Sequence, residues 1–277
     1  ASPKDLANEI ARCKDMTDKP IGVNLTFLPG FANPDYPGYI ESIVKGGVKI
    51  VETAGRSPEK FMPLLKDAGI KVIHKCTSVR HSLKAEKIGC DAVSVDGFEC
   101  GGHPGEDDIP SLVLLPQAAE ALDVPVAGCG GFSDAKSLVA ALALGGEAIV
   151  MGTRFMATKE AGIHQNVKDK MTEADELSTN LMFRTMHNTA RVFKNSISDQ
   201  VVEIESSGSA TFEDVKDLVA GQRGRVVFEE GDLEHGIWSA GISVARVKDV
   251  PSCQEMVSRL VSDAEKIIDG RLQSVKA

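Results

Sequence analysis

The sequence lacks a long apolar run, a basic stripe and any cysteine pair of the C-x-x-C type. Because a membrane-spanning helix needs about 18 or more apolar residues in a row, membrane insertion is not expected. The net charge of −9, with no basic stripe, argues against nucleic acid as a partner. The opening stretch ASPKDLANEI has the pattern of neither a signal peptide nor a transit peptide.

Cysteine is present but scattered, at six positions of the 277. In a chain of this length such spacing favours reduced thiols and a cytoplasmic location over a disulfide framework or a zinc site. The composition, 42% apolar and 26% charged, is typical of a globular protein with a large core. One large domain, or a large one with a small one, is expected.

Short runs rich in β-branched residues recur along the first part of the chain and predict six strands. They lie at 20–25, 48–54, 71–76, 91–96, 124–129 and 147–152. Helical stretches alternate with them, at 39–47, 57–69, 78–89, 111–123 and 133–146, the last with Ser133 as its expected N-cap. This alternation predicts α/β architecture with a parallel sheet, either a (β/α) barrel or an open doubly wound sheet.

The pattern changes after residue 158, where polar helical stretches replace the strand–helix alternation. We therefore expect a (β/α) barrel over 1–160, a small helical insert on the substrate side over 161–225, and a return to the barrel over 226–277. An amphipathic helix at 252–272 is expected to dock on the core. Its apolar stripe comprises Met256, Val257, Leu260, Val261, Ala264, Ile267 and Ile268.

Two glycine-bearing turns follow the last two predicted strands. Gly130-Gly131 precedes a helix, and Gly152-Thr153 follows the strand AIVM. Glycines let a backbone approach a ligand closely, and a helix N-terminus attracts anions. Neither turn has the spacing of a dinucleotide fingerprint or a P-loop. Together, at the carboxyl ends of adjacent parallel strands, they favour a phosphate site over ordinary turns.

A lone histidine, His103, follows the fourth strand in the stretch GFECGGHPGEDD (97–108). The carboxyl ends of parallel strands are where such proteins build active sites, and a histidine there can transfer a proton near neutral pH. Gly101 and Gly102 would let this loop lie flat against a planar ligand. Asn24 and Lys75, also near strand ends, would point hydrogen-bond donors at the same mouth.

Three carboxylates, Glu106, Asp107 and Asp108, end this stretch. They have the chemistry of metal ligands, but they also suit the start of the next helix, where the helix dipole favours acidic groups. We expect the helix start, and no metal is predicted.

Several stretches together resemble the nitronate monooxygenase superfamily, formerly 2-nitropropane dioxygenases, in family order along nearly the whole chain. They are GVNL (22–25), VIHKC (72–76), GFECGGHPGEDD (97–108), GCGGFSDA (128–135), MGTRF (151–155), HNTARVFKN (187–195) and GIWSAG (236–241). The resemblance implies a TIM-type (β/α)8 barrel with bound FMN and His103 as acid/base or substrate-orienting residue. It implies that Asn24 and Lys75 lie near the flavin ring and that the flavin phosphate is bound by Gly130, Gly131, Gly152 and Thr153. The planar ligand expected against Gly101 and Gly102 would then be the flavin.

The sequence departs from that family at its start, because nothing in it matches the first two βα units. GVNL would then be strand 3 and AIVMG strand 8, so six strands are predicted where a closed barrel needs eight. Either the chain is a truncation or the barrel is incomplete, and GVNL is expected to lie at an exposed sheet edge.

The family resemblance covers several reactions of small-molecule substrates. We expect oxidation of alkyl nitronates with O2, and the alternatives are an NAD(P)H:quinone reductase, with NAD(P)H as co-substrate, and an enoyl-acyl-carrier-protein reductase. An alternative of another class is a flavin-free, truncated paralogue without catalysis. The sequence leaves open whether the protein is an oligomer.

Overall fold

The computed structural model describes residues 2–27 and 34–276. Of the predicted segments 1–160 and 226–277, residues 1, 28–33 and 277 therefore lie outside the described part. The chain divides into two compact units. The first comprises Ala1–Val95 and Ala118–Val126, and the second Asp96–Gln117 and Ala127–Ala277.

The predicted parallel sheet is confirmed, with six strands in the order in which the chain makes them. All six lie within two residues of the predicted positions, because each is a short β-branched run bounded by polar or glycine residues. Their bounds are β1 (Gly22–Phe27), β2 (Ile50–Gly55), β3 (Lys71–Cys76), β4 (Ala92–Asp96), β5 (Val126–Cys129) and β6 (Ala148–Val150).

In the first unit, helices connect the strands β1 to β4. Strands β1, β2 and β3 pair in parallel, and Asn24 lies opposite Glu52 in the register. Along β3 one face, with Val72 and His74, is buried, while the other carries the less buried Lys75. The helical elements are α1 (Pro3–Met16), α2 (Tyr36–Lys45), the 3-10 turn η1 (Glu59–Phe61), α3 (Met62–Asp67) and α4 (Val79–Lys87).

In the second unit, β5 and β6 are followed by α6 (Ala135–Ala143) and the short α7 (Thr153–Met156). The expected N-cap Ser133 is wrong by one residue. Asp134 caps α6, because its carboxylate accepts the N–H of Ser137 while the Ser137 hydroxyl binds the backbone of Asp134. Helix α5 (Ser111–Ala121) follows β4 as predicted.

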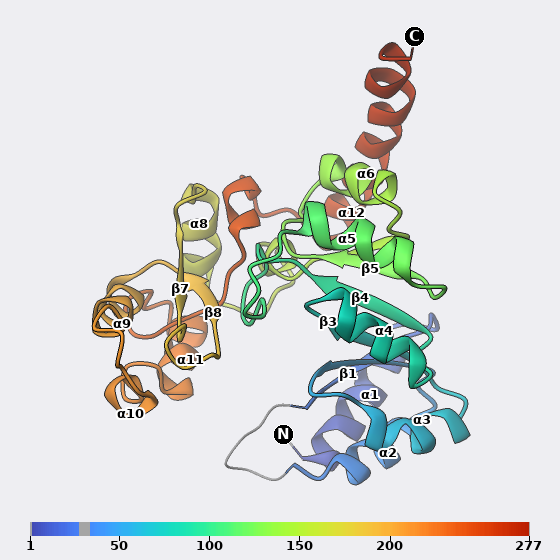
Figure 1. The fold of residues 1–277 in the computed structure, drawn as a ribbon, viewed down its shortest axis with the longest axis horizontal. Helices are drawn as coiled ribbons and strands as arrows, with labels where there is room; N and C mark the ends of the chain where they lie inside the picture. The colour runs from blue at the N-terminus through green and yellow to red at the C-terminus, as the bar shows by residue number, and fades with distance from the viewer. Residues whose placement is uncertain (1, 28–33, 277) are drawn as a thin grey trace. The chain divides into compact units, whose positions relative to one another are not determined.

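The C-terminal helix docks as predicted, since α12 (Cys253–Lys266) packs on α6 (Figure 1). Its predicted apolar stripe is correct only in part. Met256 and Ala264 are buried, whereas Val257 and Val261 remain 45% and 48% exposed. A π-helical turn, η3 (Ile267–Leu272), continues the helix.

Residues 161–225, the proposed insert, contain helices and also a hairpin that was not predicted. Strands β7 (Thr179–Met182) and β8 (Ala190–Phe193) pair antiparallel and lie beside each other in Figure 1. Each strand has only four residues, too few for a clear alternation in the sequence. The helices of the insert are α8 (Gln165–Glu173), α9 (Ser196–Glu205), α10 (Phe212–Val215) and α11 (Gly221–Glu230), and η2 (Ile242–Arg246) comes after them.

A stack of two buried aromatic rings lies at the centre of the second unit. The rings of Phe193 and Trp238 are parallel, with centroids 4.2 Å apart, and the N–H of Phe193 donates to the Trp238 carbonyl at 2.8 Å. Around them pack Val167 and Met171 of α8 and Val227 of α11. This core joins the hairpin to the segment that contains GIWSAG.

The predicted sheet edge is confirmed, because β1 and β6 stand at the two ends of the strand order. Three of the six residues of β1 are exposed, whereas four of the five residues of β4 are buried. None of the helices within 2–27 and 34–276 has the length and apolar content needed to cross a membrane.

Candidate functional site

The loop 97–108, which follows β4 and which we call the His103 loop, is packed on one side and open on another. A Cβ added to Gly101 would lie 2.8 Å from the backbone of Ala240, so only glycine fits there. Gly102 has φ of +80°, and a Cβ there would meet no atom within 4 Å. His103 comes next, with an exposed side chain. The loop therefore holds the imidazole beside free space.

The surroundings favour the neutral form of His103. The protein around the ring removes part of its hydration, which lowers the pKa of the imidazole although solvent still reaches it. The nearby negative charge of Glu106 acts in the opposite direction and is the smaller effect. With its pKa below the ordinary value of about 6.5, His103 is neutral at pH 7 and able to accept a proton.

The expectation that Glu106, Asp107 and Asp108 start the next helix is wrong. Helix α5 begins at Ser111, and the carboxylate at its N-terminus is that of Glu99, which accepts the Ser111 N–H at 2.9 and 3.1 Å. Glu99 comes earlier in the loop, and the turn closed by Cys100 N–H and Gly97 C=O folds it back toward the helix.

Two of the three loop carboxylates bind the insert instead. Glu106 accepts the N–H of Thr189 at 2.7 Å and its hydroxyl at 2.6 Å. Asp108 pairs with Arg184 at 3.0 Å. No group of three His, Cys, Asp or Glu side chains arranged to hold a metal ion occurs among residues 2–27 and 34–276.

Arg191 of β8 connects the hairpin to the start of the same loop. Its buried guanidinium donates to the carbonyl of Phe98 at 2.9 and 3.2 Å and lies over the Phe98 ring, 4.6 Å from the centroid. Its backbone exchanges two hydrogen bonds with Gly102, at 2.6 and 2.9 Å. The loop thus joins the hairpin through a single antiparallel β-bridge just before His103.

The two glycine turns differ from each other in what surrounds them. A Cβ on Gly130 would lie 2.8 Å from the Gly97 carbonyl oxygen, so this glycine is required by packing. At Gly131, with φ of +82°, the nearest atoms belong to Glu99 at 3.5 Å, an ordinary contact. A Cβ on Gly152 would meet nothing within 4 Å. Open space therefore remains at the second turn, whereas the second glycine of the first turn lies against the side chain of Glu99.

Thr153 is buried, and its hydroxyl accepts the N–H of Gly241 at 2.9 Å. Gly241 also lies against the His103 loop, since a Cβ on it would stand 2.8 Å from the Glu99 carbonyl oxygen. The segment GIWSAG thereby bridges the turn after β6 and the His103 loop.

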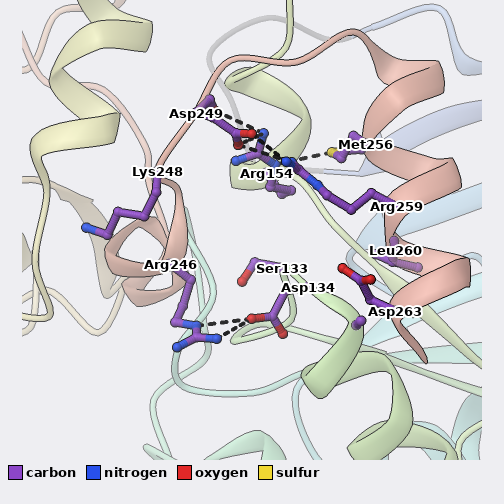
Figure 2. A pocket seen from close by; sticks show the side chains of 11 residues that line it. Ser133, Asp134, Arg154, Arg246, Lys248, Asp249, Met256, Arg259, Leu260 and Asp263 are labelled. Carbon is purple, nitrogen blue, oxygen red and sulfur yellow. Dashed lines mark hydrogen bonds and ion pairs between the residues drawn. The ribbon is translucent and has the colours of Figure 1, made fainter. Parts of the chain in front are cut away.

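A cavity of about 320 Å³ is lined by Ser133, two residues after Gly131, and by Arg154, the residue after Thr153 (Figure 2). Arg154 is buried and pairs with Asp249 at 3.3 Å, and Arg259 of α12 reaches the same carboxylate at 2.6 Å. Arg246 of η2 pairs with Asp134. These ion pairs tie both turns to η2 and α12.

Asn24 and Lys75 lie in the first unit, and the other predicted site residues lie in the second. Within the first unit, Glu52 contacts both Asn24 and Lys75. Its carboxylate accepts the amide N–H of Asn24 at 2.7 Å and lies 3.6 Å from the ammonium of Lys75. The hydroxyl of Thr26 donates to the other end of the Asn24 amide at 2.7 Å, which orients the amide group.

The residues that sequence reasoning missed are Glu52, Glu99, Thr189 and Arg191. Two of them carried a signal, because Glu52 and Arg191 are charged residues inside short apolar strands, VETA and ARVF. A charge in such a place requires a partner. Glu99 and Thr189 carried no comparable signal.

Residues 30–263 match the family model described as nitronate monooxygenase. That match covers most of the chain and includes both glycine turns and the His103 loop. The chain belongs to the nitronate monooxygenase family. The resemblance predicted from its motifs is therefore confirmed, and the protein is an oxidoreductase of that family.

Two curated relatives illustrate the range of this family. One is (3aS,4S,5R,7aS)-5-hydroxy-7a-methyl-1-oxo-octahydro-1H-indene-4-carboxyl-CoA dehydrogenase of Rhodococcus jostii, 28% identical over 96% of this chain and 83% of its own length. Another is a probable nitronate monooxygenase of Bacillus subtilis, 29% identical over 84% of this chain and 69% of its own.

Among solved structures, FabK from Thermotoga maritima superposes with a TM-score of 0.91 at 28% identity, covering 99% of this chain and 85% of that one. FabK is a TIM-barrel protein, so the predicted fold class is confirmed.

Proposed function

We propose that this oxidoreductase uses FMN and oxidises alkyl nitronates with O2. The observation that carries the proposal is the unfilled space on the ligand side of the glycines. Side chains at Gly102 and Gly152 would meet nothing within 4 Å, while their neighbours Gly101 and Gly130 are packed against backbone. The motifs around these positions are those for which the family resemblance implies a flavin.

The residues present fit the phosphate of FMN. The backbone N–H groups of Gly131, Gly152 and Thr153 are the donors that would hold it, and Gly152 leaves room for phosphate oxygens. The Thr153 hydroxyl accepts from Gly241 and keeps its own proton to donate. Gly101 and Gly102 would pass beside the flavin, and Asn24 and Lys75 stay predicted ring contacts. Bound FMN would supply the electron acceptor for the reaction.

His103 would act on the substrate rather than on the flavin. Its imidazole is exposed, is followed and preceded by glycine-rich backbone, and is neutral near pH 7. In that form the ring N–H can donate a hydrogen bond to a nitronate oxygen and hold the substrate in place, and the other ring nitrogen can accept the α-proton of a bound nitroalkane. The same ring, once protonated, would give a proton to the oxygen of a reduced quinone.

A second candidate is an NAD(P)H-dependent reductase on the same scaffold, of the quinone type. The amino-acid sequences of the stretches HPGEDDIPSLVLLP and HKCTSVRH resemble that branch of the family. A relative that matches 96% of this chain is named a dehydrogenase, which supports chemistry that does not consume oxygen.

The experiment is anaerobic mixing of the purified, yellow protein with each reductant in turn. Loss of the flavin absorbance with propionate 3-nitronate, and not with NADH or NADPH, is the expected result. Bleaching by a nicotinamide nucleotide alone would replace the proposal with the reductase, and an enoyl thioester that then reoxidises the flavin would identify the enoyl-acyl-carrier type. A colourless protein that FMN cannot reconstitute would leave only the flavin-free paralogue.

A further inference from the structure

The His103 loop is attached to the insert at four positions, spread over its whole length. The attachments are the Phe98 carbonyl to Arg191, the Gly102 backbone to Arg191, the Glu106 carboxylate to Thr189 and the Asp108 carboxylate to Arg184. All the partners come from the hairpin or the turn that joins its strands. The insert therefore makes the framework on which the loop rests.

His103 itself lies between the two glycines of that loop that have positive φ. Gly102 and Gly105 both have positive φ, +80° and +87°, and glycine backbone loses more conformational freedom on ordering than any other. The Gly102–Arg191 backbone pair fixes the chain on one side of His103. On the other side, the first fixed residue is Glu106. The anchors at Gly102 and Glu106 thus bracket three residues, 103 to 105.

The second anchor, at Glu106, consists of two hydrogen bonds to a single residue of the insert. Glu106 is exposed, yet its carboxylate binds two donors of one buried residue, Thr189, which is 1% exposed. Hydrogen bonds to a charged acceptor are the stronger and shorter kind. Asp107, the next residue, makes no such contact in the described chain and serves as a natural comparison.

We propose that Glu106 is a positioning residue, which fixes the His103 loop on Thr189 of the insert and thereby sets the place and the charge environment of the imidazole. This inference rests on the proposed role of His103. The charged groups around the loop are Glu99, Glu106, Asp107 and Asp108 on the loop itself and Arg184 and Arg191 on the hairpin. Burial lowers the pKa of His103, and the negative charge of Glu106 partly opposes that effect.

The test is the titration of His103 followed by NMR in protein with isotope-labelled histidine. The chain has only six histidines, and the His103→Asn variant identifies the signal. Glu106→Gln keeps the shape and removes the charge, so the pKa of His103 should fall below that of the unsubstituted protein. Asp107→Asn, the matched control, removes a neighbouring charge and should move this pKa less.

The contribution of the insert to the position of His103 is tested by Thr189→Val, which keeps the shape of the side chain and deletes its hydroxyl. We expect the pKa of His103 to fall by less than in Glu106→Gln, because the carboxylate loses one donor and is held less firmly but keeps the backbone N–H of residue 189. We expect kcat/KM to drop by up to about 10²-fold through misplacement of the ring. FMN content and melting temperature serve as checks that the variant folds. For Glu106→Gln, a smaller loss in kcat/KM than for Glu106→Ala would mark rescue by the conservative change.

An unchanged His103 titration in both Glu106→Gln and Thr189→Val would overturn the inference, as would equal effects of Glu106→Gln and Asp107→Asn. These readouts do not depend on turnover. If His103→Asn keeps full activity while the titration shifts as expected, the proposed catalytic role fails and the coupling through Glu106 stands.

Discussion

Glycines that look alike in the sequence have different tasks in the structure. Gly101 and Gly130 are packed so tightly that any side chain would collide with backbone at 2.8 Å. Gly131 has a positive φ, so a substitution there strains the fold even though space is available. Gly152, with φ of −97°, has neither restriction. It is the position at which ligand binding can be separated from folding.

We predict that Gly152→Leu abolishes flavin binding without unfolding the protein. The side chain would occupy the space proposed for the phosphate, and the backbone conformation is one that leucine adopts freely. Flavin absorbance per protein should fall to a small fraction, with an unchanged melting temperature of the flavin-free form. Gly162→Leu, another glycine with nothing within 4 Å, is the control and should keep its flavin. Full FMN content in Gly152→Leu would place the phosphate elsewhere.

For His103 we predict that His103→Asn lowers kcat/KM by roughly 10²–10⁴, the range of general acid–base help. FMN content and melting temperature should barely change, because the side chain is exposed. Full activity of the variant would make His103 a bystander, and a colourless, unfolded variant would make it structural.

The pH profile gives a separate measurement on the same residue. With a neutral nitroalkane as substrate the neutral imidazole is the form that can accept the α-proton, so activity should be lost as the pH falls through the pKa of His103, which lies below about 6.5. This acid limb should be missing in His103→Asn. A profile that is the same in both proteins would assign the titration to another group.

At the scale of elements, a single carboxylate joins three segments of the first unit. Asp91, just before β4, accepts the N–H of Val72 in β3 at 2.8 Å and binds Lys66 and Lys71 at 2.7 and 2.9 Å. Partial burial raises the pKa of Asp91, but the hydrogen bonds from Lys66, Lys71 and Val72 outweigh it and lower the value to about 2.

We predict that Asp91→Ala lowers the free energy of unfolding by about 1–3 kcal/mol, because the N–H of buried Val72 loses its acceptor. The pKa of Asp91 is lowered on folding. Its contribution is therefore complete above about pH 4, the ordinary range of an aspartate, and is lost as the pH falls toward about 2. Urea unfolding between pH 7 and pH 3 measures both effects. Asp67→Ala, an exposed carboxylate at the end of α3, is the control.

The hairpin β7–β8 is the element with the largest consequence for the site. Its strands contribute Met182, Ala190 and Val192 to one core and Phe193 to another, so both faces are buried. Such burial fixes the hairpin, and a fixed hairpin can hold the His103 loop in one place. An insert made of helices alone would not have offered the backbone edge that pairs with Gly102.

At the scale of the whole molecule, the edge of the sheet at β1 is the feature that we expect to promote self-association. Strand β1 pairs with β2, and β1 is the first strand of the sheet order. Exposed strand edges carry unpaired backbone donors and acceptors and promote association with other chains, and natural proteins often protect them with lysine.

We predict that the chain self-associates through β1 and that Gly22→Lys reduces this association. The position is exposed, and a Cβ there would stand 3.5 Å from Ile50, an ordinary contact, so the strand should persist. Light scattering during incubation at increasing protein concentration measures the effect. Gly162→Lys adds the same charge far along the chain and should not protect. Equal protection by both variants would mean that net charge alone governs solubility.

Much of the architecture was already determined by the amino-acid sequence. The six strands and the helices between them follow from local runs of β-branched residues and from glycine and capping signals, which act over a few residues. The order of the strands in the sheet does not, because a barrel and a doubly wound sheet share the same local pattern. The glycine turns, His103 and the family follow from motifs of similarly short range. These features are predictable because the interactions behind them are local.

Only the tertiary structure decided how the charged residues are used. Glu99, not Glu106, occupies the start of α5, and Glu106 instead binds Thr189, 83 residues away. Arg191 reaches Phe98 across 93 residues, and this pairing of hairpin and loop has no signature in either segment alone. A carboxylate suits a helix N-terminus, a metal or a distant hydroxyl equally well by its chemistry. Which partner it meets depends on the packing of elements far apart in the sequence, and local patterns do not carry that information.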